Sequence, residues 1–98
     1  MPTKRFLLGR LVATPGALAA CSPDHIFVCL VRHVTGDWGD CCAEDKKEND
    51  RALLHGERIL SAYAIDPTKP CDGYGDNCLW IITEWDRSLT TVLLPEEY

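Results

Sequence analysis

The sequence predicts an α+β fold in which two or three N-terminal helices pack on a three-stranded antiparallel meander. Helix caps and a helical spacing of apolar side chains mark residues 14–55, whereas residues 57–95 are rich in β-branched and aromatic side chains. The chain has 98 residues, of which 46% are hydrophobic and 26% charged, and this balance is typical of one soluble globular domain. We therefore expect a single domain over residues 1–98, with its helical part at about 14–55 and its sheet part at about 57–95.

The first predicted helix begins after Thr14, a common N-cap, with Pro15 at its first position and small apolar residues behind it. The same region has a second interpretation, because residues 1–21 combine a cationic start, an apolar middle and a small-residue ending. That is the outline of a secretory or lipoprotein signal. Arg10 and the pair Pro15-Gly16 interrupt the apolar stretch. They favour the helix, and with it a cytoplasmic protein whose N-terminus stays intact.

The second predicted helix follows Ser22, Pro23 and Asp24, which supply an N-cap, a first-turn proline and a first-turn acid. Apolar side chains then recur at helical spacing until Gly36 ends the run, and this stripe consists of Phe27, Leu30, Val31 and Val34. The β-branched residues of the segment also suit a buried strand. The capping signals favour the helix.

A third helix is predicted over residues 41–55, with Asp40 as its cap and Gly56 as its end. Opposite charges three or four residues apart, such as Lys46 and Asp50, support an exposed face. The inward stripe consists of Cys42, Asn49, Ala52 and Leu53. Because a buried amide must find hydrogen-bond partners, we expect Asn49 to tie this helix to a loop or a strand.

Three strands are predicted in the second half of the chain, at residues 58–65, 79–85 and 89–94. A short turn at residues 86–88 joins the last two strands into a hairpin. The Pro, Gly and Asp content of residues 66–77 predicts a loop longer than an ordinary hairpin loop. Helices on one side of such a sheet leave its other face open to water.

Alternation along the middle strand assigns its side chains to two faces. One face holds Leu79, Ile81, Thr83 and Trp85, and the other holds Trp80, Ile82 and Glu84. Glu84 indicates that its face points outward, which exposes Trp80 and Ile82 as a contact patch. The alternative is that the N-terminal segment folds over this face and buries both side chains.

The chain has six cysteines, and a cytoplasmic protein keeps its thiols reduced; they are Cys21, Cys29, Cys41, Cys42, Cys71 and Cys78. Cys71 and Cys78 flank the long loop. They can be free, bridged, or part of a metal site together with His33, His55 or Cys41. No CxxC or HxxxH spacing occurs in the chain, so zinc is disfavoured and we expect no metal and no cofactor.

An activated thiol nucleophile needs a cysteine, a base and an orienting acid, and Cys41 or Cys42, His33 and Asp37 are of these residue types. The sequence does not fix the geometry of these groups. The chain also has no phosphate-binding glycine loop and no GxSxG motif. We therefore expect a protein that is not an enzyme.

The formal net charge is -5, which disfavours direct binding of nucleic acid. Residues 1–35 carry four cations and one anion, whereas residues 36–57 and 58–98 each carry seven anions and three cations. No apolar run reaches the ~18 residues of a membrane helix, so we expect no membrane partner.

Acidic side chains gather in the predicted loop and third helix, at Asp37, Asp40, Glu44, Asp45, Glu48 and Asp50. A row of carboxylates can imitate a phosphate backbone and occupy a basic DNA-binding groove. The alternative is a solvated helix face that Lys46, Lys47 and Arg51 compensate. The sequence favours this alternative.

Several segments resemble a family of small bacterial proteins that plasmids and integrative elements encode. They are residues 33–40 (HVTGDWGD), Glu44-Asp45, residues 49–53 (NDRAL), residues 58–63 (RILSAY) and the C-terminal stretch with LWIITE, DRS, TT and LLPEEY. The resemblance covers most of residues 11–98. The cysteines and the longer 66–77 loop depart from the family pattern. Genes of these relatives lie near genes that protect mobile DNA from host defences.

The resemblance implies a mobile-element accessory protein that inhibits a host defence complex, of the CRISPR or restriction type, by protein–protein binding with partial DNA mimicry. It carries over no catalytic residues. The predicted partner-binding residues are Asp37, Trp38, Asp40, Glu44, Asp45, Glu48, Trp80, Glu84, Trp85 and Arg87. An alternative is a small self-associating module that forms a homodimer through an edge strand at 89–94, or through Trp80 and Ile82. A thiol or zinc enzyme is the third possibility.

Overall fold

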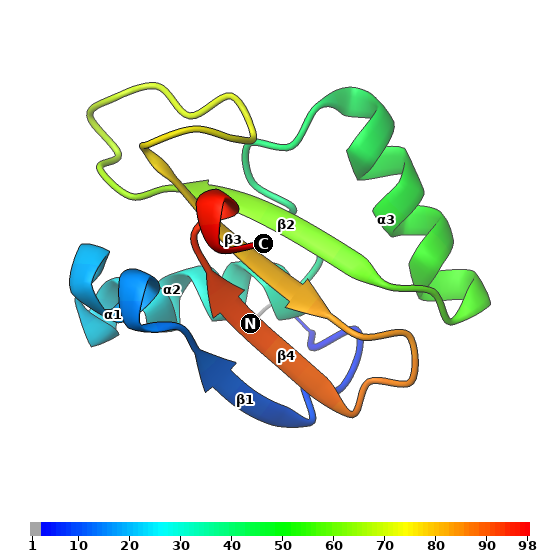
Figure 1. Ribbon diagram of the computed structural model, residues 1–98. Helices are drawn as coiled ribbons and strands as arrows, with labels where there is room; N and C mark the ends of the chain where they lie inside the picture. The colour runs from blue at the N-terminus through cyan, green and yellow to red at the C-terminus, as the bar shows by residue number, and fades with distance from the viewer. Residues whose placement is uncertain (1–2) are drawn as a thin grey trace.

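The protein folds into a four-stranded mixed sheet, and the two longer helices lie on one of its faces (Figure 1). The computed structural model describes residues 3–98. Its elements are β1 (Arg10–Ala13), α1 (Pro15–Ala20), α2 (Pro23–Val34), α3 (Ala43–His55), β2 (Ile59–Ala64), β3 (Cys78–Thr83), β4 (Leu89–Leu93) and a 3-10 turn, η1 (Pro95–Glu97). No helix within this part of the chain is long and apolar enough to cross a membrane.

The predicted α+β class is confirmed, but the predicted three-stranded meander is incomplete. β2, β3 and β4 form antiparallel pairs as expected, and β1 adds a fourth strand parallel to β4. The sheet order is β1-β4-β3-β2, so the sheet is not confined to residues 57–95. Residues 89–94, predicted as an edge strand, therefore lie inside the sheet. β1 escaped prediction because four residues carry little local signal, and their partner is about 80 residues away in the chain.

The capping signals of the first two helices are confirmed. The Thr14 hydroxyl accepts a hydrogen bond from the Ala17 N–H at 3.2 Å, and the Ser22 hydroxyl accepts one from the His25 N–H at 3.1 Å. Pro15 and Pro23 each occupy the first helical position. Residues 23–34 are thus helical rather than a buried strand, because these caps satisfy backbone donors that a strand would present differently.

The third helix begins later than predicted, and Asp40 is not its cap. Cys42 occupies the N-cap position without a side-chain hydrogen bond. The Asp40 N–H instead donates to the Ala62 carbonyl at 2.7 Å, next to a parallel bridge between Gly39 and Ala62. Pairing with the edge of β2 thus delays the helix start. Gly56 ends the helix in a left-handed conformation, as predicted.

The main core lies between the sheet and α2, and a second cluster lies under α3. Leu79, Ile81 and Thr83 share the helix-facing side of β3 and are fully buried, as the alternation predicted. Trp85 does not belong to this face. It lies in the turn after β3 and is 67% exposed.

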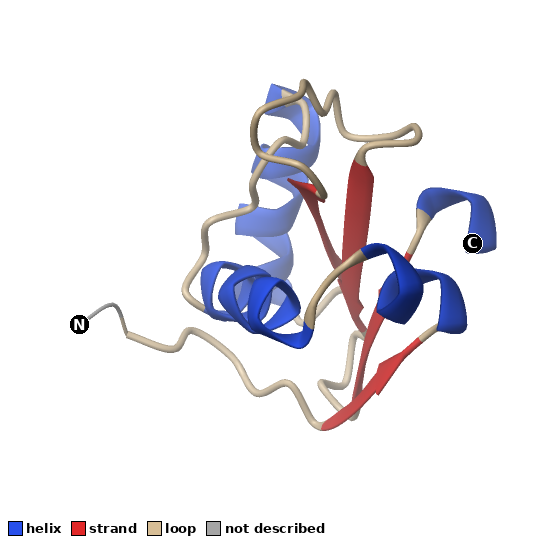
Figure 2. Cartoon of the chain, turned by 90° about the vertical axis from the view of Figure 1, so that its left-hand side faces the viewer, coloured by secondary structure: helices blue, strands red, loops and turns tan. Residues whose placement is uncertain are grey.

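The other face of the sheet is covered by the C-terminus rather than by the N-terminal segment. The Tyr98 ring packs edge-on against Trp80 at 5.7 Å, and Arg58 donates to the Tyr98 hydroxyl at 2.6 Å. Figure 2 shows η1 and the α2–α3 layer on opposite sides of the sheet. Trp80 is half-buried and Ile82 is buried, so the predicted exposed Trp80–Ile82 patch is reduced to part of one ring. Neither alternative for this face was correct.

Candidate functional site

Two of the predicted partner-binding residues turn inward or are tied down. Trp38 is only 5% exposed, stacks on Phe6 and donates its indole N–H to Asp50 at 2.9 Å. Asp37 accepts a bond from Arg32 at 2.7 Å, and this hydrogen bond holds the pKa of its carboxyl below the ordinary value. In this conformation Trp38 has almost no surface to offer a partner, so its role is to position the loop against α3.

The acidic side chains of the predicted row are exposed, but they do not all share one side of α3. Glu44 and Glu48 are four residues apart and lie on the same side, whereas Asp50 faces Trp38. Glu48 also pairs with Arg51, whose guanidinium reaches Glu57 at 3.9 Å. The remaining exposed members of this group are Asp40 and Asp45, with Lys46 and Lys47 beside them. This interleaving matches the solvated face more closely than a phosphate-like row.

The turn between β3 and β4 presents Trp85 and is held by side-chain hydrogen bonds. Arg87, the one non-glycine residue with positive φ among residues 3–98, donates to the carbonyls of Ala52 at 3.0 Å and Glu57 at 2.6 Å. It thereby joins the turn to the C-terminal end of α3. Glu84 is half-buried, and its backbone N–H donates to the Leu89 carbonyl. Of the three tryptophans, Trp85 alone is largely exposed.

A buried polar chain around His33 runs from α2 through the sheet, and sequence reasoning did not find it. His33 Nδ1 lies 2.6 Å from Ser61 Oγ, and His33 Nε2 lies 2.8 Å from Thr83 Oγ1. Thr83 lies 2.8 Å from Thr90, and the Thr90 hydroxyl donates to the Leu8 carbonyl at 2.7 Å. The bond from Thr90 to Leu8 determines which group donates in the neighbouring bonds of the chain, since a carbonyl can only accept.

Because Thr90 donates to Leu8, Thr83 must donate to Thr90 and accept the Nε2–H of His33. When the ring is neutral, His33 Nδ1 accepts the hydrogen bond of the Ser61 hydroxyl. Burial, and secondarily the charge of Arg87, lower the pKa of His33 to about 3. Both nitrogens of His33 are engaged and the side chain is fully buried, so the chain acts as a structural link.

The predicted thiol constellation is not assembled around His33. Cys41 is buried, its thiol donates to the Leu60 carbonyl at 3.5 Å, and burial raises the pKa of Cys41 to about 11. Cys42 is exposed at the start of α3. Among residues 3–98, no three or more His, Cys, Asp or Glu side chains are grouped closely enough to hold a metal ion.

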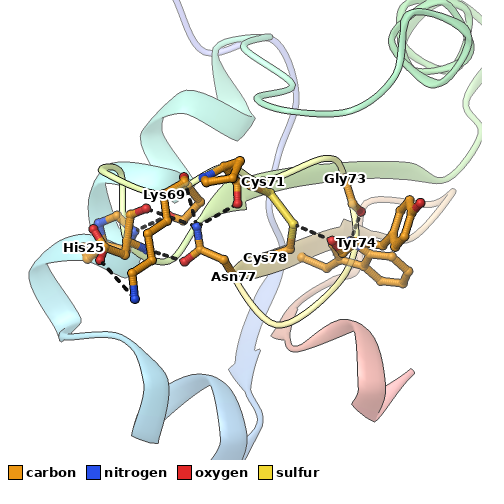
Figure 3. The surroundings of a disulfide bond; sticks show 11 residues. His25, Lys69, Cys71, Gly73, Tyr74, Asn77 and Cys78 are labelled. Carbon is orange, nitrogen blue, oxygen red and sulfur yellow. Dashed lines mark hydrogen bonds and ion pairs between the residues drawn. A yellow bond between two sulfur atoms is a disulfide. The ribbon is translucent and has the colours of Figure 1, made fainter.

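Cys71 and Cys78 form a disulfide at the base of the long loop, which answers the question that the sequence left open (Figure 3). Cys21, Cys29, Cys41 and Cys42 are free thiols, so the expectation of six reduced cysteines holds only for these four. Asn77 organises the same loop. Its amide nitrogen contacts the carbonyls of Asp66, Lys69 and Pro70, each at 3.1 Å.

An apolar groove of about 350 Å³ opens between β1, α1 and α2, and sequence reasoning did not anticipate it. Leu11, Leu18 and Phe27 line the groove and are 50%, 57% and 67% exposed. Phe27 and Val31 belong to the apolar stripe predicted for α2, but both side chains are exposed, and Phe27 lines this groove. The sequence did contain a signal for this groove, because the apolar stripe predicted for α2 is wider than the side of the helix that faces the core.

Comparisons of the chain with protein-family models, with curated proteins and with solved structures give no match.

Proposed function

We propose that this protein binds a host defence complex of the bacterium that carries it, of the CRISPR or restriction type, and blocks it without transforming a substrate. The resemblance of residues 33–63 and 79–98 to mobile-element proteins supplies the class of partner. The main support for a binding role is the exposure of Trp85, a large aromatic side chain that is 67% exposed on a hydrogen-bonded turn. Interface hot spots are enriched in tryptophan.

The support of Trp85 limits the entropy that binding would cost. Asp86 accepts from both the N–H and the hydroxyl of Ser88, at 3.1 and 2.6 Å, which closes the turn. Arg87 then fastens this turn to α3 through the carbonyls of Ala52 and Glu57. An aromatic side chain on a turn that is already ordered keeps more of its contact energy as affinity.

The charge around this surface favours a basic partner. Asp86 on the turn is exposed, Glu57 at the end of α3 shares Arg51 with Glu48, and the chain as a whole carries a net charge of -5. Carboxylates around an aromatic centre form the polar rim of a typical interface and speed encounter with a basic surface. Because cations interrupt the acidic groups, protein–protein contact is favoured over extended DNA mimicry.

The test expresses the protein with candidate defence complexes and measures both direct binding and the escape of plasmid or phage. We expect the wild type to protect, and Trp85→Ala to lose protection with an unchanged melting temperature, because Trp85 makes few contacts inside the protein. Tyr74→Ala is the matched control, since Tyr74 is 73% exposed on the distant 66–77 loop. Full protection by Trp85→Ala, or no protection by the wild type against any system, contradicts the proposal.

A further inference from the structure

We infer that the outer edge of β1 pairs with β1 of a second copy of this chain, in an antiparallel register that continues the sheet across a two-fold axis. This inference is independent of the host-defence proposal. It identifies a surface that differs from both homodimer surfaces predicted from the sequence. Figure 1 shows β1 at the margin of the sheet, beyond β4.

The two margins of the sheet differ in how their backbone groups are satisfied. On β2, Asn49 bonds both backbone groups of Leu60, at 2.6 and 3.1 Å. Residues 38–40 bond both backbone groups of Ala62, and His25 donates to the Ala64 carbonyl at 2.9 Å. The β2 margin is therefore closed.

The β1 margin is open among the described residues. The N–H groups of Arg10 and Thr14 donate to Ser88 and Val92 of the β4 side, so the residues that alternate with them, Leu11 and Ala13, point their backbone groups away from the sheet. An open edge strand presents donors and acceptors that another strand can satisfy.

The neighbouring residues select one symmetric register. Pairing Leu11 with Ala13 of the partner, and Ala13 with Leu11 of the partner, lets each pair exchange both of its N–H···O bonds around a central Val12–Val12 pair. A register shifted toward the C-terminus would oppose Leu11 to Pro15, which has no N–H. A shift the other way would oppose Ala13 to Gly9, whose φ of +65° ends the strand.

This register also covers the apolar groove. The side chains of Leu11 and Ala13 point to the helix-facing side of the sheet, where Leu18 and Phe27 are exposed. Leu11 of the partner then lies beside Ala13 and enters the groove. Because the axis passes through Val12, the same contact forms twice, which is the self-complementarity that a two-fold dimer requires.

The charges are complementary in the same register, and this favours a second copy over an unrelated peptide. Arg10 is exposed and takes part in no ion pair within residues 3–98. It falls opposite Thr14 of the partner, whose hydroxyl donates to the Glu97 carboxylate at 2.5 Å. Arg10 and Glu97 thus meet across the axis twice, and no like charges are opposite each other within the paired residues 10–14.

The first test measures the mass of the protein in solution by light scattering from about 1 to about 200 µM. We expect a dimer whose dissociation constant Leu11→Lys raises at least about 30-fold, because the charge enters an apolar contact. Leu11 is half-exposed, so the monomer tolerates this change. Leu54→Lys, at an 83% exposed site on α3, is the control and leaves the dimer intact. A monomer at all concentrations, or a dimer that Leu11→Lys does not weaken, overturns the inference.

The second test reads the register by cross-linking in a Cys42→Ser background, which removes the exposed free thiol. The two Val12 Cα atoms lie about 4.5 Å apart in the proposed pair, within disulfide range, so Val12→Cys cross-links the dimer with oxidised glutathione. The two Leu11 Cα atoms lie about 8–9 Å apart, beyond that range, so Leu11→Cys does not. Equal cross-linking of both variants, or none with Val12→Cys, rules out this register.

Discussion

Asn49 and His33 are buried polar side chains that join helices to the sheet. Asn49 bonds both backbone groups of Leu60 on β2, and this tie was predicted, because a polar residue on an apolar helical stripe is visible in the sequence. The sequence left His33 open as a candidate ligand, a candidate base or an ordinary helix residue. Its structural role depends on Ser61 and Thr83, which are 28 and 50 residues away in the chain, and no local pattern marks such partners.

The buried neutral state of His33 predicts a specific pH dependence of stability. The unfolded chain binds a proton at His33 below the ordinary pKa of about 6.5, whereas the folded protein resists protonation down to a pKa of about 3. The free energy of unfolding therefore falls as the pH drops from 6.5 toward 3, by up to about 1.4 kcal/mol per pH unit from this group. Well above pH 6.5, where the unfolded chain no longer protonates His33, the group contributes no pH dependence.

Urea denaturation at a series of pH values tests this expectation. His33→Gln removes the titrating group, so the slope of stability against pH between 6.5 and 4 should become smaller than in the wild type. His55→Gln is the control, because His55 is exposed at the end of α3. An unchanged slope in His33→Gln would show that the protonation of His33 is not linked to folding.

At the scale of elements, the segment 38–40 closes one margin of the sheet, and Gly39 makes this possible. Gly39 has a φ of +73°, and a Cβ at this position would overlap the carbonyl oxygen of Ala62 and the Tyr63 ring. A side chain therefore cannot be added without separating the segment from β2. The sequence predicted a tight loop here, but not that the loop pairs with a strand.

Gly39→Ala should lower the free energy of unfolding by roughly 3 kcal/mol or more, because backbone strain and a steric clash combine. Gly75→Ala is the matched control: Gly75 also has positive φ, at +100°, but nothing lies within 4 Å of the added Cβ. In Gly75→Ala the free energy of unfolding should fall by only about 1 kcal/mol, because only the backbone strain at positive φ remains. Chemical denaturation measures both, and equal losses would mean that the contact with Ala62 contributes nothing.

At the scale of the whole molecule, the three tryptophans report on three different environments. Trp38 lies between the loop and α3, Trp80 lies under Tyr98, and Trp85 projects from the turn. The sequence placed Trp80 and Trp85 on opposite faces of one strand. The structure instead separates them by depth, because β3 ends at Thr83 and the C-terminal turn folds back over the sheet.

Acrylamide quenching of fluorescence should therefore act mainly on Trp85. Trp85→Phe is expected to remove most of the quenchable emission, whereas Trp38→Phe is expected to remove emission that is weakly quenched, because Trp38 is 5% exposed. Each variant is compared with the wild type at the same protein concentration. Strong quenching that survives in Trp85→Phe would place another tryptophan at the surface and contradict this arrangement.

The sequence alone determined the α+β class, the caps of α1 and α2, the end of α3, the three antiparallel strands and the inward face of β3. Each of these depends on residues within one turn or one strand of each other, where local backbone preferences and burial patterns act. Only the tertiary structure decided the parallel partner of β1, the His33 chain and which margin of the sheet stays open. Those features join segments that lie far apart in the chain, so their energy depends on packing that no short stretch of sequence encodes.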